Sequence, residues 1–133
     1  MIVASLLRPA LALLVLATFA CPTLAQEGEY SDGKDGELSA KISHIKDDLY
    51  AVAIDTFVLE GDVAGCIAFI EGETNLDATG GTLVVEDGGE HREISLSFDA
   101  AGALTITEQG GCFAFTGGQC SFDGQVMKVV AAN

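Results

Sequence analysis

Two cysteines eight positions apart are the residues of this chain whose type and spacing could do chemistry. Cys112 and Cys120 flank Gly117 and Gly118 in the stretch GGCFAFTGGQC. Such a pair could form a disulfide, hold a metal ion or take part in thiol redox reactions. The compartment decides among these, because disulfides persist in exported proteins and are rare in the cytosol.

The first 25 residues predict export. Arg8 precedes an apolar run over residues 10–20, and Thr-Leu-Ala stands directly before Gln26. A charged start, a short apolar segment and small residues at the cleavage point are typical of a secretory signal peptide. We therefore expect residues 1–25 to be removed and residues 26–133 to form a single domain in the periplasm or outside the cell.

Cys21 raises the alternative of a lipoprotein anchored through this cysteine. Thr18 and Phe19 stand before it, where a lipoprotein signal usually has Leu and a small residue, so the pattern favours cleavage before Gln26. The apolar run is also shorter than the about 20 residues of a transmembrane helix. No later segment is apolar over such a length, and we expect no transmembrane segment.

In an oxidising compartment, the sequence favours a disulfide between Cys112 and Cys120, because the glycine pair between them can turn the chain back. Cys66 lies in an apolar run and is expected to stay reduced and buried. The alternative is a bridge from Cys66 to either of the others. Phe113 and Phe115 share one face of a strand, and we expect them to pack on the domain rather than form a binding tip.

The sequence supports a metal site or an active site less well than it supports a disulfide. A structural zinc site needs four ligands, usually in closely spaced pairs, whereas His44 and His91 lie alone in separate turns. Asp32 and Asp35 do not have the spacing of a calcium-binding EF-hand loop. Because no nucleophile motif or phosphate-binding loop is recognisable either, we predict a protein without enzymatic activity, metal or cofactor.

Alternation of apolar and polar residues predicts antiparallel strands that are buried on one face. VAGCIAF (63–69) is apolar on both faces and is interpreted as a central strand. Turns are expected at DGKDG (32–36), KDD (46–48), EGET (71–74), DGG (87–89) and DAAG (99–102). The strands are expected at residues 28–31, 38–42, 50–54, 63–69, 81–87, 94–98, 104–106 and 125–130.

These elements predict an all-β domain. About eight strands with short connections can form a small antiparallel up-and-down barrel, closed by pairing of the terminal strands. A two-sheet β-sandwich is the alternative. No convincing helix is expected after residue 25.

The charge of the chain limits its partners. Twenty acidic residues against six basic ones give a formal net charge of −14. Nucleic acid is excluded as an expected partner, because its phosphates would be repelled, and an anionic membrane surface is disfavoured for the same reason. A cationic protein or peptide fits this charge.

The end of the chain, ITEQGGCFAFTGGQCSFDGQVMKV, has a cysteine-flanked turn followed by Phe122, Asp123, Gly124 and a last strand. It resembles the C-terminal part of small exported envelope proteins of Gram-negative bacteria that have no assigned function. Val126 and Met127 stand where that pattern has an aromatic residue. The resemblance implies an envelope protein with a barrel-like fold and assigns no functional residue.

Three functions remain open from the sequence. The first is a periplasmic or secreted protein that binds a cationic protein or peptide, as an inhibitor of lysozyme would. The second is a carrier that encloses a small apolar ligand, for which the aromatic residues could line a cavity. The third is a structural envelope component. The lining of the carrier cavity would come from Tyr50, Phe57, Phe69, Phe98, Phe113 and Phe115.

Overall fold

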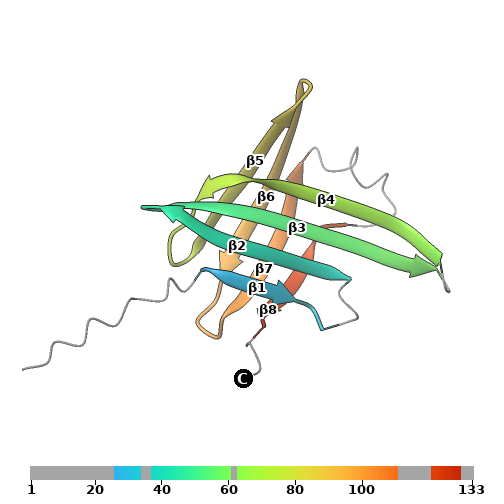
Figure 1. Ribbon diagram of the computed structural model, residues 1–133, viewed down its shortest axis with the longest axis horizontal. Helices are drawn as coiled ribbons and strands as arrows, with labels where there is room; N and C mark the ends of the chain where they lie inside the picture. Colours follow the sequence, from blue (N-terminus) through green and yellow to red (C-terminus); the bar gives the residue numbers. More distant parts are fainter. Residues whose placement is uncertain (1–25, 34–36, 61–62, 111–120, 130–133) are drawn as a thin grey trace, which may run out of the picture.

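The computed structural model describes residues 26–33, 37–60, 63–110 and 121–129. Eight antiparallel strands form one sheet that curves into a nearly closed barrel (Figure 1). The all-β prediction and the up-and-down order are therefore confirmed. The strands are β1 (Gly28–Ser31), β2 (Leu38–Lys46), β3 (Leu49–Glu60), β4 (Val63–Asn75), β5 (Gly80–Asp87), β6 (Glu90–Phe98), β7 (Ala103–Gly110) and β8 (Gly124–Lys128).

The terminal strands close the barrel on one side, as expected. The order across the sheet is β4-β3-β2-β1-β8-β7-β6-β5, and β1 pairs with β8 through Tyr30 opposite Lys128 and Ser31 opposite Met127. The remaining opening therefore lies between β4 and β5, which are consecutive in the chain and form the two ends of the sheet. No helix in the described ranges is long and apolar enough to cross a membrane.

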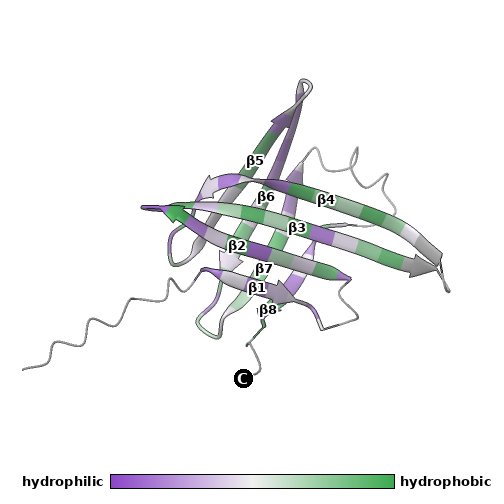
Figure 2. Cartoon of the chain, viewed as in Figure 1, coloured by the Kyte–Doolittle hydropathy of each residue, from purple (hydrophilic) through white to green (hydrophobic). Residues whose placement is uncertain are grey.

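The interior is filled by the alternate residues that the sequence pattern marked as apolar. Figure 2 shows the hydrophobic positions along the strands. Phe122, just before β8, is fully buried, and Tyr30 and Tyr50 are 2 % exposed. The cluster comprises Tyr30, Leu38, Ala40, Ile42, Tyr50, Val52, Ile54, Ala68, Ile70, Leu76, Leu83, Ile94, Leu96, Leu104, Ile106, Phe122 and Val126.

The position of β4 corrects one prediction. The stretch from residue 63 to 69 was expected to be central because it is apolar on both faces, but β4 is an end of the sheet. Ala68 and Ile70 face the core, whereas Ile67 and Phe69 face outward and are 73 % and 43 % exposed. The apolar residues on the outer face of β4 are therefore exposed, and burial of both faces does not explain why they are apolar.

EGET (71–74) is not a turn, contrary to expectation, because it lies within β4. Gly72 instead allows the close approach of β5: a Cβ at this position would lie 3.0 Å from Leu83 Cδ1 and 3.2 Å from Val85 Cγ2. The chain turns after Asn75, where the N–H and carbonyl of Asp77 bond to the carbonyl and N–H of Gly80.

The predicted turns at KDD (46–48), DGG (87–89) and DAAG (99–102) are confirmed, whereas DGKDG (32–36) lies largely outside the described residues. Gly88, Gly89 and Gly102 have positive φ angles at the DGG and DAAG turns, and Asp47 has φ 45° at the KDD turn. Asp99 closes its turn by accepting hydrogen bonds from the N–H groups of Ala101 and Ala103, both at 2.9 Å. The turns at KDD, DGG and DAAG each join two strands that pair as an antiparallel hairpin: β2 with β3, β5 with β6, and β6 with β7.

Candidate binding face

The outer side of β2, β3 and β4 carries a shallow hollow of about 440 Å³. Its floor is formed by Ala51 and Ala53 of β3, whose small side chains leave the space unfilled. Because successive side chains of a strand alternate between its faces, these odd-numbered residues point away from the buried Val52 and Ile54. The hollow is therefore a feature of the outer surface and not of the barrel interior.

The walls of the hollow are polar and unequal in charge. On one side, Lys41 and Ser43 of β2 lie opposite Ala53 and Ala51. On the other side, β4 places one glutamate opposite each alanine, Glu71 opposite Ala53 and Glu73 opposite Ala51. Neither glutamate makes an ion pair within the described residues. The β4 wall thus presents two solvated carboxylates that can attract a cation.

The same outer face continues from the hollow into an apolar area. In the next two cross-strand pairs Asp55 lies opposite Phe69, and Phe57 lies opposite Ile67. We call the outward residues Ala51, Ala53, Asp55, Phe57, Ile67, Phe69, Glu71 and Glu73 the β3–β4 outer face. This face places the carboxylates of Asp55, Glu71 and Glu73 beside the apolar side chains of Phe57, Ile67 and Phe69, so it can interact with a ligand that is both cationic and apolar.

The aromatic residues predicted to line a carrier cavity lie on different sides of the sheet. Tyr50 is buried inside, and Phe98 packs partly buried against the core. Phe57 and Phe69 belong to the β3–β4 outer face, so the expectation that they line the interior is wrong. Phe113 and Phe115 lie outside the described residues.

Of the cysteines for which the sequence made predictions, only Cys66 lies among the described residues. Cys66 is half-buried against the core and is disulfide-bonded, which corrects the expectation that it stays reduced. Its partner lies outside the described residues, because Cys21, Cys112 and Cys120 all do. The predicted bridge between Cys112 and Cys120 therefore falls on residues that the structure does not describe.

A second hollow, of about 480 Å³, lies at one end of the barrel between β2, β3 and β8. Asp32 and Asp123 line it, but both carboxylates accept hydrogen bonds from backbone N–H groups, Asp32 from Leu38 at 3.2 Å and Asp123 from Glu108 at 2.6 Å. These hydrogen bonds join Asp32 to the start of β2 and Asp123 to β7, so both carboxylates already have partners within the fold. The described residues contain no group of three or more side chains suited to hold a metal ion.

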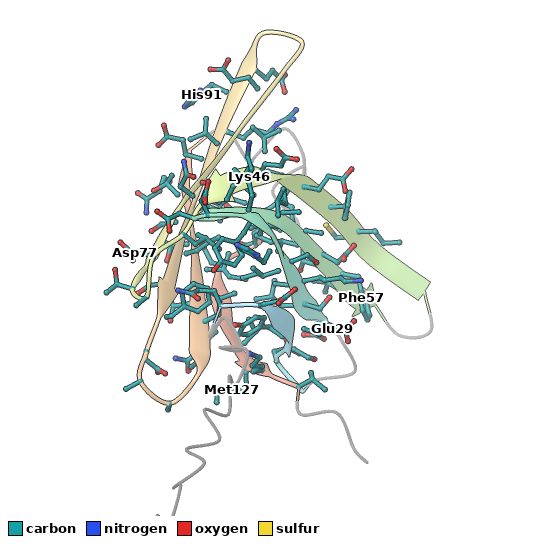
Figure 3. All side chains as sticks on the ribbon, turned by 60° about the vertical axis from the view of Figure 1, so that its left-hand side comes forward. Glu29, Lys46, Phe57, Asp77, His91 and Met127 are labelled. Atoms are coloured by element: carbon teal, nitrogen blue, oxygen red, sulfur yellow. The ribbon has the colours of Figure 1, made fainter. Side chains whose placement is uncertain are left out.

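His91 lies at the tip of the β5–β6 hairpin, remote from Phe57 (Figure 3). Its Nδ1 is 3.1 Å from Glu86 Oε1, and its Nε2 is 2.7 Å from Glu93 Oε1. Only the protonated ring can donate to both carboxylates. Its hydrogen bonds to Glu93 and then Glu86 raise the pKa of His91 above its usual 6.5, against a smaller effect of desolvation.

The His91 contacts give a pH prediction. Because the pKa of His91 is raised in the folded state, its stabilising effect is full below the unfolded value of 6.5 and is lost as the pH rises through the folded pKa. We expect Glu93→Gln to lower the pKa of His91 more than Glu86→Gln does, as measured by NMR titration of the ring protons. An unchanged pKa in both variants would contradict the two contacts.

The acidic hollow could not be found from sequence motifs. Glu71 and Glu73 fell in a stretch interpreted as a turn, and Ala51 and Ala53 looked like ordinary positions of a half-buried strand. Only the register of β2, β3 and β4 brings these residues together. Comparisons of the chain with models of protein families, with curated proteins and with solved structures found no match.

Proposed function

We propose that this protein is an exported, non-enzymatic binding protein whose acidic outer surface engages a cationic protein or peptide. The observation that supports this most is the hollow over Ala51 and Ala53, walled on one side by Glu71 and Glu73. Carboxylates that are not already neutralised by a neighbouring cation remain available to a basic ligand, and the net charge of −14 favours rapid encounter.

The signal-like first 25 residues and the resemblance of the last third to Gram-negative envelope proteins support a periplasmic or secreted location. The disulfide at Cys66 fits an oxidising compartment. A carrier function is less well supported, because the interior is occupied by its own side chains from Tyr30, Tyr50 and Phe122. The predicted absence of nucleic-acid binding and of enzymatic activity remains part of this proposal.

Binding measurements with a basic lysozyme and with a lysine-rich peptide test the proposal. We expect the Glu71→Gln and Glu73→Gln double variant to bind about three- to tenfold more weakly than the wild type at about 0.15 M salt, since each exposed ion pair contributes up to about 1 kcal/mol. Isothermal titration calorimetry at two salt concentrations measures the effect, which should shrink at the higher one.

The matched control is the Asp47→Asn and Asp48→Asn double variant at the β2–β3 turn. It removes the same charge from exposed residues, and Asn tolerates the positive φ of Asp47. Equal weakening in both double variants would indicate a general charge effect rather than a site. No binding of either basic ligand at low salt would overturn the proposed function.

A further inference from the structure

Gln26, the first residue that the structure describes, accepts hydrogen bonds from two tyrosines of different strands. The hydroxyl of Tyr30, in β1, donates to the main-chain carbonyl of Gln26 at 2.9 Å. The hydroxyl of Tyr50, in β3, donates to its side-chain Oε1 at 3.4 Å. The half-buried residue that precedes the barrel is thus attached to two of its strands.

Both tyrosines are core residues whose hydroxyl groups need an acceptor. A buried hydroxyl without a hydrogen bond destabilises the folded state, and Gln26 supplies one oxygen atom to each. Burial raises the pKa of Tyr30 above its usual 10.0. Burial and then the negative charges of Asp48 and Glu27 raise the pKa of Tyr50. Both hydroxyls therefore keep their protons at neutral pH and remain donors to Gln26.

Removal of the predicted signal peptide would give Gln26 a reactive amine. The sequence predicts cleavage between Ala25 and Gln26, which makes Gln26 the N-terminal residue. The α-amine nitrogen of an N-terminal glutamine can attack its own side-chain Cδ, because the two groups are held together in one residue. A bond forms between this nitrogen and Cδ, the Cδ–Nε2 bond breaks, and Nε2 leaves as ammonia with the proton that the amine gives up. The product is the five-membered lactam pyroglutamate, and no further reactant is needed.

The hydrogen bonds of Gln26 match the atoms that this reaction keeps. The lactam retains Oε1 and the main-chain carbonyl oxygen, which are the two atoms that the tyrosines contact. Nε2, the atom that leaves, donates to no residue of the described part of the chain. When the amine adds to Cδ, negative charge develops on Oε1, and the Tyr50 hydroxyl is placed to stabilise it. The contacts therefore suit both the reaction and its product.

We propose that the mature chain begins at Gln26 and that this residue becomes pyroglutamate, whose two carbonyl oxygens accept the hydrogen bonds of Tyr30 and Tyr50. The lactam has no basic amine, so the modification removes the positive charge of the N-terminus. It also fixes the side chain of Gln26, and less rotational freedom is then lost when the oxygens meet the tyrosines. The modification depends on the predicted export and not on the cationic ligand proposed above.

The test exports the full chain from a bacterium and follows the purified, oxidised protein by intact-mass spectrometry at constant pH and temperature. We expect the mass of residues 26–133 and the progressive loss of one ammonia molecule, which tandem mass spectrometry of the N-terminal peptide assigns to Gln26. The same protein unfolded in urea gives the reference rate. The folded protein should cyclise about fivefold faster, the effect of one hydrogen bond that is stronger in the transition state. The Gln26→Ala variant should lose no ammonia from this peptide.

Tyr50→Phe should reduce the folded rate to about the unfolded rate, whereas its rate in urea should equal that of the wild type. Thr56→Val is the matched control, because it removes another buried hydroxyl of β3 and should leave the folded rate unchanged. If Tyr50→Phe does not fold, the comparison of folded and unfolded wild type still decides.

A different first residue, such as a lipid-modified Cys21, would overturn the proposal, as would a Gln26 that stays uncyclised in the folded protein. Equal folded and unfolded rates would overturn the role of the tyrosine contacts. Binding of basic ligands is measured separately, so each of these results leaves the test of the proposed function intact.

Discussion

Phe122→Ala is expected to destabilise the domain by about 3–5 kcal/mol, the usual cost of removing a fully buried phenylalanine ring. Phe122 is completely inaccessible to solvent and belongs to the core cluster, although it lies just outside β8. Its backbone N–H donates to Glu108 Oε1 at 2.8 Å, so the residue is held in place while the ring is lost. The core around it therefore has little freedom to collapse into the space.

The measurement is thermal and urea unfolding of the oxidised protein. Domains of this size are stable by about 5–15 kcal/mol, so the variant should lose a large share of its stability and melt at least about 10 °C lower. Phe69→Ala is the matched control, because the same atoms are removed from a side chain that is 43 % exposed on the outer face. Similar losses in both variants would contradict the placement of Phe122 in the core.

The strands could be predicted from sequence because their signal is local. The alternation of Ile94, Leu96 and Phe98 with polar residues depends only on the two faces of one strand. The prediction of a barrel followed from the number of strands and the short turns between them. Pairing of β1 with β8 was inferred from the need to close such a sheet, and the structure confirms it.

What the sequence could not provide is the environment of each face. Ile67 and Phe69 made β4 look central, since an apolar residue carries no information on whether a neighbouring strand or a partner covers it. Gly72 was interpreted as a turn residue, whereas its role is to admit Leu83 and Val85. A glycine that permits close packing and a glycine that permits a turn are identical in sequence.

The candidate site was missed for the same reason. Lys41, Ala53 and Glu71 are far apart in the chain and become neighbours only through the register of three strands. The contacts of His91 with Glu86 and Glu93 were closer in sequence, but their geometry depends on the hairpin pairing of Glu86 with His91. Charge composition predicted the class of ligand, and strand register was needed to propose where it binds.

Gly80→Ala is expected to destabilise the fold by about 3 kcal/mol or more, because two effects act together. Gly80 has φ 131°, a conformation that residues with a side chain rarely adopt, and a Cβ at this position would lie 1.8 Å from the carbonyl oxygen of Leu96. This obstacle is backbone of β6 and cannot rotate away as a side chain could. The β5 strand would have to move away from β6 at its first residue.

Such a shift would also disturb the β4–β5 turn. The N–H of Gly80 donates to Asp77 Oδ1 at 3.0 Å, and the Thr79 N–H and hydroxyl donate to the same oxygen at 2.7 Å. These hydrogen bonds, first that of the Thr79 hydroxyl, lower the pKa of Asp77. The turn joins the two ends of the sheet at the place where they are in contact, so the loss of its geometry should widen the opening beside β4.

The Gly102→Ala variant measures the cost of a positive φ angle without the steric clash that Gly80→Ala adds. Gly102 has φ 84°, but a Cβ there would meet no atom within 4 Å, so only the conformational cost of a left-handed alanine, about 1 kcal/mol, applies. Urea unfolding at 25 °C should therefore show a loss for Gly80→Ala at least twice that for Gly102→Ala. Equal losses of unfolding free energy in the two variants would mean that the β6 backbone moves away at Leu96 at no energetic cost. The close approach of the β5 and β6 backbones would then contribute nothing to closing the barrel.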